Sequence, residues 1–128
     1  EFRRVLFRSW NSAVNIMRPI IELAGDFNLA LAFYGYACAK NGNLALANQL
    51  LQQLERKHHT PGAPPLDHLL SLMYISLGDK EKFYEYYEEA SRKKIVSALY
   101  YYNSPLLADV AGEQRMLAIR KNLQMSSS

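Results

Sequence analysis

The chain has 128 residues, of which 49% are hydrophobic and 21% are charged. This composition is that of one folded domain and excludes an intrinsically disordered segment, which would have few apolar residues and a high net charge. The longest apolar run, over 29–39, spans 11 residues, whereas a membrane-spanning helix needs about 20. Cys38 is the only cysteine, so we expect no internal disulfide and a reducing, cytoplasmic location.

The formal net charge of +3 depends largely on the first nine residues. Residues 1–9 contain three Arg and one Glu and resemble the in-frame translation of a common sequencing adapter, which implies that they lie outside the native fold. The remaining residues carry 12 Lys and Arg against 11 Asp and Glu, so we expect no direct contact with nucleic acid and no membrane partner. Because no Met begins the chain, we also expect it to be the C-terminal part of a longer protein.

After Trp10, apolar residues recur at helical spacing, and no stretch alternates with the period of two that a strand would show. The pattern predicts four helices in the middle of the chain, separated by a turn at 41–43, a Pro-rich loop over 60–65 and a second turn at 77–79. The expected buried faces are Leu31, Tyr34, Gly35 and Cys38, then Leu44, Ala47, Leu51 and Leu54, then Leu66, Leu70, Met73, Tyr74 and Leu77, and last Phe83, Tyr87, Ala90 and Lys94. The chain is therefore predicted to be all-α.

The two predicted turns lie 36 residues apart, and removing about two residues of the Pro-rich loop leaves a period of 34. Gly42 and Gly78 stand at corresponding helix ends, where a left-handed residue is favourable. The residues that match positions of a 34-residue repeat are Ala13, Gly35, Gly42, Ala47, Leu51, Tyr74, Gly78, Tyr87 and Ala90. On these residues the chain resembles the tetratricopeptide family, with a partial repeat at 11–26 and full repeats at 28–61 and 64–97.

This resemblance implies a short right-handed superhelix of α-hairpins. Two antiparallel helices approach within about 8–10 Å only where small residues lie at the crossing. The expected crossing pairs are Gly35 with Ala47 and Ser71 with Ala90, while Leu51 and Tyr87 are expected to fill the space between successive units. A missing upstream repeat would leave an apolar face uncovered, so we also expect self-association through the N-terminal side.

Residues 98–125 are expected to cap the array, and 126–128 to fray. A tyrosine-containing stretch leads to Ser104 and Pro105 and then to a final apolar helix. This layout resembles the closing segment of tetratricopeptide arrays in large bacterial regulators. The cap of a solenoid needs a polar exterior. We expect Met116, Ile119 and Leu123 to cover the last repeat, and Arg115, Arg120 and Lys121 to face water.

The sequence contains no arrangement typical of a catalytic, metal or cofactor site. His58 and His59 are adjacent and are expected to be solvated at a helix end, with His68 across the Pro-rich loop. Cys38 falls on a face expected to be buried, which favours a structural thiol over a nucleophile. The basic run 92–94 is expected to interact with the negative end of its helix. We therefore expect no enzyme, no bound metal and no cofactor.

In the tetratricopeptide family the first helix of each unit lines a concave groove. The corresponding residues are Leu29, Ala32, Tyr36, Lys40, His68, Leu72 and Ile75. The resemblance therefore implies a scaffolding module that binds a peptide or a helix of a protein partner in a mostly apolar groove. Leu29 and Tyr36 could instead pack against an upstream repeat.

The tyrosine-rich end leaves a second hypothesis open. Tyr100, Tyr101 and Tyr102, together with Tyr74 and Tyr87, could enclose a pocket for a small molecule. The chain would then be a ligand-sensing regulatory domain. A closed apolar pocket would favour this hypothesis, whereas a filled interior beside an open groove would favour the interaction module.

Overall fold

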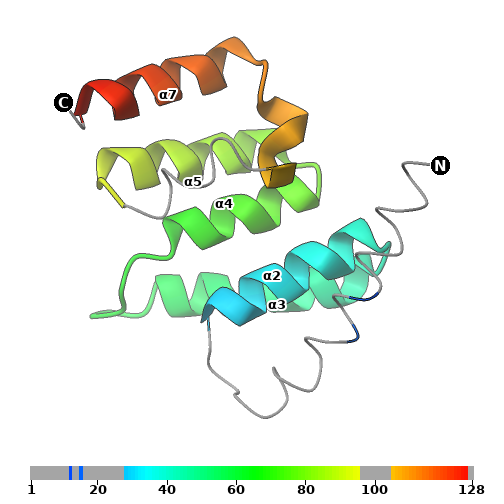
Figure 1. Cartoon of the computed structure of the whole chain (residues 1–128). Coiled ribbons are helices and arrows are strands. Elements are labelled where there is room, and N and C mark those ends of the chain that lie inside the picture. Colours follow the sequence, from blue (N-terminus) through cyan, green and yellow to red (C-terminus); the bar gives the residue numbers. More distant parts are fainter. Residues whose placement is uncertain (1–11, 13–14, 16–27, 96–104, 127–128) are drawn as a thin grey trace.

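The computed structural model describes residues 12, 15, 28–95 and 105–126 (Figure 1). This part of the chain forms helices and no strands, which confirms the predicted all-α class. The elements in chain order are α2 (Asn28–Lys40), α3 (Leu44–His58), α4 (Asp67–Ser76), α5 (Lys80–Arg92), the 3₁₀ helix η1 (Pro105–Val110) and α7 (Gln114–Ser126).

Several expectations concern residues outside the described part of the chain. They are the adapter-like segment 1–9, the repeat position Ala13 with most of the partial repeat 11–26, and the tyrosines at 100–102. The side chain of Leu123 is also outside it. Among the helices that are described, none combines the length and the hydropathy that crossing a membrane requires.

Two helical hairpins, α2–α3 and α4–α5, turn through corners with the same backbone geometry. Gly42 and Gly78 are both left-handed, with φ of 89° and 82°, and only glycine adopts this conformation without steric cost. The N–H groups of Asn41, Gly42 and Asn43 donate to the carbonyls of Ala37, Ala39 and Cys38. The N–H groups of Leu77, Gly78 and Asp79 donate in the same way to Met73, Ile75 and Tyr74, in each case 36 positions further along.

The second helix of each hairpin begins with the same type of cap. The side chain of Asn43 accepts a hydrogen bond from the N–H of Leu46, and that of Asp79 accepts one from the N–H of Lys82. These bonds satisfy a donor that the first helical turn leaves without a partner. Asp79 is thus the N-cap of α5.

α5 ends in a third corner of this type, with Lys94 in the place of glycine. Lys94 has a φ of 55° and is the one described residue other than glycine with a positive φ. Its N–H donates to Ser91, and the N–H of Ile95 donates to Ala90. The prediction that Lys94 belongs to a buried helical face is therefore wrong, because the helix ends at Arg92 and Lys94 is exposed.

The buried faces otherwise follow the expected residues closely. Leu44 is an exception: it is 53% exposed, whereas Leu50 of the same helix is buried. Leu44 is the first residue of α3, beside the corner, where no described element covers it. Its place in the predicted buried face is therefore wrong.

The interior consists of two apolar clusters that share α4. The first joins α2, α3 and α4 and includes Leu51. The second joins α4, α5, η1 and α7, and includes Tyr87 and also Tyr36 of α2. α4 is consequently buried on nearly every side, as expected of a helix that packs between neighbours. The stacking of elements that results is visible in Figure 1.

Gly35 marks a close approach between α2 and α4. A Cβ atom at this position would overlap the Sδ and Cε atoms of Met73 and would lie 3.6 Å from the Cβ of Leu50. Ala47 is fully buried but is not among the atoms nearest to this site, so the tightest contact at Gly35 is with Met73 of the next hairpin. At the other expected crossing, Ser71 and Ala90 are both fully buried.

η1 and α7 extend the stack beyond the second hairpin. η1 packs against α4, and α7 packs against α5. Glu113 lies 34 residues after Asp79, and the two residues stand in corresponding places. The backbone carbonyl of Asp79 accepts a hydrogen bond from the N–H of Phe83, and the carbonyl of Glu113 accepts one from the N–H of Leu117. α7 buries Met116 and Ile119 against the second cluster.

Candidate interaction site

The residues expected to line a groove come from α2 and α4, which pack side by side. Leu29 is 39% exposed, and Lys40 and His68 are partly exposed. The others have exposures of only 0–2%, and they are Ala32, Tyr36, Leu72 and Ile75. The expected set therefore divides into an accessible part and a buried part.

Residues 105–110 of the same chain cover three residues of the buried part, Tyr36, Leu72 and Ile75. Leu107 and Val110 of η1 are fully buried, and they belong to the same cluster as Tyr36, Leu72 and Ile75. Figure 1 shows η1 in orange beside the end of α4. This portion of the expected groove is filled in the structure by the segment that follows the second hairpin.

Two polar contacts fix η1 on this face. The Tyr36 hydroxyl donates to the carbonyl oxygen of Leu106 at 2.8 Å, and Lys40 Nζ lies 3.4 Å from Asp109 Oδ2. The same ammonium group lies 5.6 Å from the centre of the Tyr36 ring. Burial and then the nearby Asp109 carboxylate raise the pKa of the Tyr36 hydroxyl, so it stays protonated and remains a donor.

The accessible part is weakly charged. Burial lowers the pKa of His68, and the opposing effect of the Asp67 carboxylate is smaller. The imidazole is therefore neutral near pH 7. Lys40 supplies a positive charge and Leu29 an exposed apolar side chain. The accessible part thus contains one apolar side chain, one neutral imidazole and one cation that pairs with Asp109.

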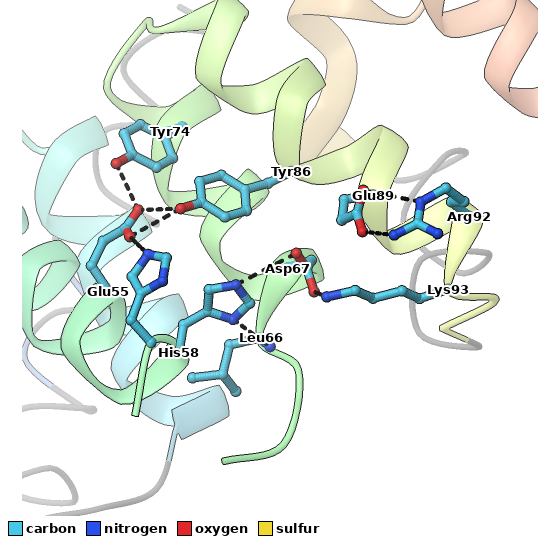
Figure 2. A network of polar contacts seen from close by, with 10 residues as sticks. Glu55, His58, Leu66, Asp67, Tyr74, Tyr86, Glu89, Arg92 and Lys93 are labelled. Carbon is cyan, nitrogen blue, oxygen red and sulfur yellow. Dashed lines mark hydrogen bonds and ion pairs between the residues drawn. The ribbon is translucent and has the colours of Figure 1, made fainter. Parts of the chain in front are cut away.

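A separate polar network joins the two hairpins around Glu55 of α3 (Figure 2). Its Oε1 atom accepts hydrogen bonds from the hydroxyls of Tyr74 and Tyr86, both at 2.8 Å. His59 lies 3.0 Å from the other oxygen, Oε2. The rings of Tyr74 and Tyr86 stack with centroids 5.7 Å apart and an interplanar angle of 7°. Burial first, and then the bond to Glu55, raise the pKa of both hydroxyls.

A second group of polar residues surrounds Asp67, whose side chain is only 2% exposed. Lys93 Nζ lies 2.9 Å from Oδ2, and His58 Nε2 lies 3.6 Å from Oδ1. His58 Nδ1 accepts from the N–H of Leu66 at 3.2 Å. Figure 2 shows Lys93 reaching across to Asp67 from α5. These contacts compensate the cost of burying a carboxylate.

The expected solvation of His58 is wrong. Its side chain is only 13% exposed, because the chain after the Pro-rich loop brings Leu66 and Asp67 against the ring. His59, by contrast, is 66% exposed. The basic run 92–94 was expected to interact with the negative end of its helix. In the structure, two of its residues have carboxylate partners: Lys93 pairs with Asp67, and Arg92 pairs with Glu89 of the same helix.

The side chains of His58 and Cys38 are enclosed by the chain. Both ring nitrogens of His58 face a partner, Nδ1 the N–H of Leu66 and Nε2 the carboxylate of Asp67. Cys38 is fully buried, where a thiolate would be disfavoured. The described residues contain no group of three or more His, Cys, Asp or Glu side chains able to hold a metal ion.

Of the tyrosines in the small-molecule hypothesis, the structure describes Tyr74 and Tyr87, and these two do not converge. Tyr74 directs its hydroxyl to Glu55, whereas Tyr87 is fully buried and its ring stacks on that of Phe83. A hollow of about 410 Å³ lies between α5 and α7. On its rim, Arg115 pairs with Glu88, and Arg92 pairs with Glu89.

No family model matches the chain, and neither do the curated proteins or the solved structures with which it was compared.

Sequence reasoning missed the residues of the two polar groups, namely Glu55, Asp67, Tyr86 and Lys93. Their bonded partners lie up to 31 positions away in the chain, and no local spacing connects them. One signal was present: Asp67 directly follows an apolar residue at the start of a helix expected to be buried, and a carboxylate in such a place requires a partner.

Proposed function

We propose that the chain is a tetratricopeptide-like, non-catalytic module for protein–protein interaction. It binds a peptide or a helix of a partner protein through the face formed by α2 and α4. The observation that carries this proposal is the equivalence of the corners at Gly42 and Gly78, with the same three backbone hydrogen bonds 36 residues apart. Repeated hairpins of this type stack into scaffolds that present a continuous surface.

The distribution of polar groups supports the same proposal. Glu55, His58 and Asp67 bond to partners within the chain, which favours a role in holding the hairpins together. The accessible part of the α2–α4 face contains the apolar Leu29, the neutral His68 and Lys40, whose charge an acidic residue of the chain, Asp109, already pairs with. Such a surface is suited to an apolar segment that carries acidic residues.

A selection of peptides from a displayed library on the purified full chain tests the proposal. Selected peptides should bind Leu29→Ala and His68→Ala variants about fivefold or more weakly than the wild type, because truncating an interface contact costs about 1 kcal/mol or more. Gln52→Ala is the matched control, because Gln52 is exposed on α3, away from this face. Failure to select any peptide, or equal binding to all three variants, would contradict the proposal.

A further inference from the structure

The conformation of η1 depends on the surface beneath it. It consists of two short 3₁₀ turns joined by a kink at Leu107, whose backbone angles, φ −104° and ψ 19°, are not helical. Isolated helical turns of this length are not stable alone in water. Contacts with α2 and α4 therefore determine this shape.

The apolar contacts of η1 have a simple pattern. Leu107 and Val110 are fully buried, whereas Ala108 and Asp109 between them are exposed. Residues three positions apart lie on one side of a 3₁₀ helix. One side of the segment is thus seated on Tyr36, Leu72 and Ile75, in the way a short recognition peptide inserts its anchors into a groove.

The polar contacts add direction and charge selectivity. The Tyr36 hydroxyl donates a hydrogen bond to the carbonyl oxygen of Leu106, which directly precedes the first apolar anchor, Leu107. Lys40 faces Asp109, the residue just before the second anchor. A segment of the opposite charge at this position would place two cations together.

We propose that residues 105–110 are an internal ligand of the α2–α4 face, which a partner peptide of the same chemistry displaces. Such a peptide has two apolar residues three positions apart and an acidic residue directly before the second. This inference rests on the proposed function and specifies the partner class. The internal segment competes at the high effective concentration typical of tethered ligands, so it limits binding in trans.

The experiment uses a labelled synthetic peptide with the sequence of residues 104–112 and the full-length chain. Fluorescence anisotropy should show binding about tenfold or more tighter for the Leu107→Ala/Val110→Ala chain than for the wild type, because the internal competitor is weakened. The single variant Val110→Ala should lie between them. Circular dichroism of each variant monitors the helices of the two hairpins.

Two further substitutions, made in the Leu107→Ala/Val110→Ala chain (the released chain), test the polar contacts. Tyr36→Phe should weaken peptide binding by about fivefold through loss of one hydrogen bond. Lys40→Glu should weaken it by about two- to fivefold, and a peptide carrying Asp109→Lys should restore the affinity. A peptide carrying Leu107→Ala and Val110→Ala is the negative control.

Equal binding to wild-type and released chains, or binding that ignores the charge at Lys40, would overturn the inference. So would unfolding of both the double and the single variant, since the segment would then be part of the core. A wild-type dimer that the peptide dissociates would show that a second copy supplies the segment. If library-selected peptides bind through Leu29 and His68 while this peptide does not bind, the proposed function stands and the internal ligand does not.

Discussion

Lys94 holds a left-handed backbone conformation at the end of α5, which costs an L-residue about 1–2 kcal/mol. Glycine fills the same place at the other two corners. Lys94→Gly should therefore stabilise the chain by about 0.5–1 kcal/mol, after subtraction of the entropy that glycine loses on folding. Urea unfolding followed by circular dichroism measures this difference.

The same substitution in a regular helix serves as the control. Lys121→Gly, at an exposed position of α7, should destabilise the chain by about 1 kcal/mol. Similar effects of both substitutions would contradict the role assigned to the left-handed conformation of Lys94.

Because Gly35 has no side chain, the end of the Met73 side chain can pack directly against the backbone of α2 at this point. Gly35→Ala requires the flexible end of the buried Met73 side chain to shift, so we expect the change to stabilise the chain by less than the gain in helix propensity of about 1 kcal/mol. In a Met73→Ala background the same change should stabilise the chain by that full gain. The coupling energy of this double-mutant cycle is the decisive measurement, and a value near zero would exclude the close approach of α2 and α4 at this point.

Among the elements, α7 is attached to α5 mainly through its first residues. Glu113 accepts a bond from Lys80 at 2.6 Å and another from the hydroxyl of Tyr84. Arg115 pairs with Glu88 and lies 4.6 Å from the centre of the Tyr84 ring. These ion pairs are accessible to solvent, so they fix the orientation of α7 but contribute little to its stability.

The attachment of α7 should weaken in acid. The bonds from Lys80 and then Tyr84 lower the pKa of Glu113 below its ordinary value of 4.5. A lowered pKa in the folded state means stability that is present above pH 4.5 and lost as the pH falls through the folded pKa. We expect the difference in unfolding free energy between wild type and Glu113→Gln to shrink toward zero from pH 7 to pH 3. A difference that does not change with pH would refute this assignment.

The sequence predicted the elements whose boundaries depend on local chemistry. The glycines at 42 and 78, the caps and the Pro-rich loop locate α2 to α5 because each acts within a few residues. It did not predict that η1 would cover Tyr36, Leu72 and Ile75, since this depends on where the chain returns after α5. The contacts of Glu55 and Asp67 were missed for the same reason: their partners are brought together only when the hairpins stack.

For the whole molecule, the tyrosine hydroxyls predict sensitivity to alkali. Burial is the largest cause that raises the pKa of Tyr36, Tyr74, Tyr84 and Tyr86. Tyrosines of an unfolded chain ionise near pH 10. Stability should therefore be complete below about pH 10 and decrease as the pH rises further.

Tyrosinate absorbance and helical circular dichroism measured in one titration test this expectation. The tyrosinate absorbance of the buried tyrosines should appear only when helical circular dichroism is lost. In the Tyr86→Phe variant, the free energy of unfolding should decrease less steeply with pH. Complete ionisation near pH 10 with the helices intact would contradict it.

The bond from Tyr36 to Leu106 spans 70 positions of the chain and connects the first described helix with the segment beyond the second hairpin. In a solenoid each repeat contacts only its immediate neighbours, so the repeats can separate one after another. Here α2 is bonded to η1, which lies beyond the second hairpin, so separating the two hairpins also requires that this bond be broken. Release of η1 would therefore loosen both described hairpins together rather than one of them alone.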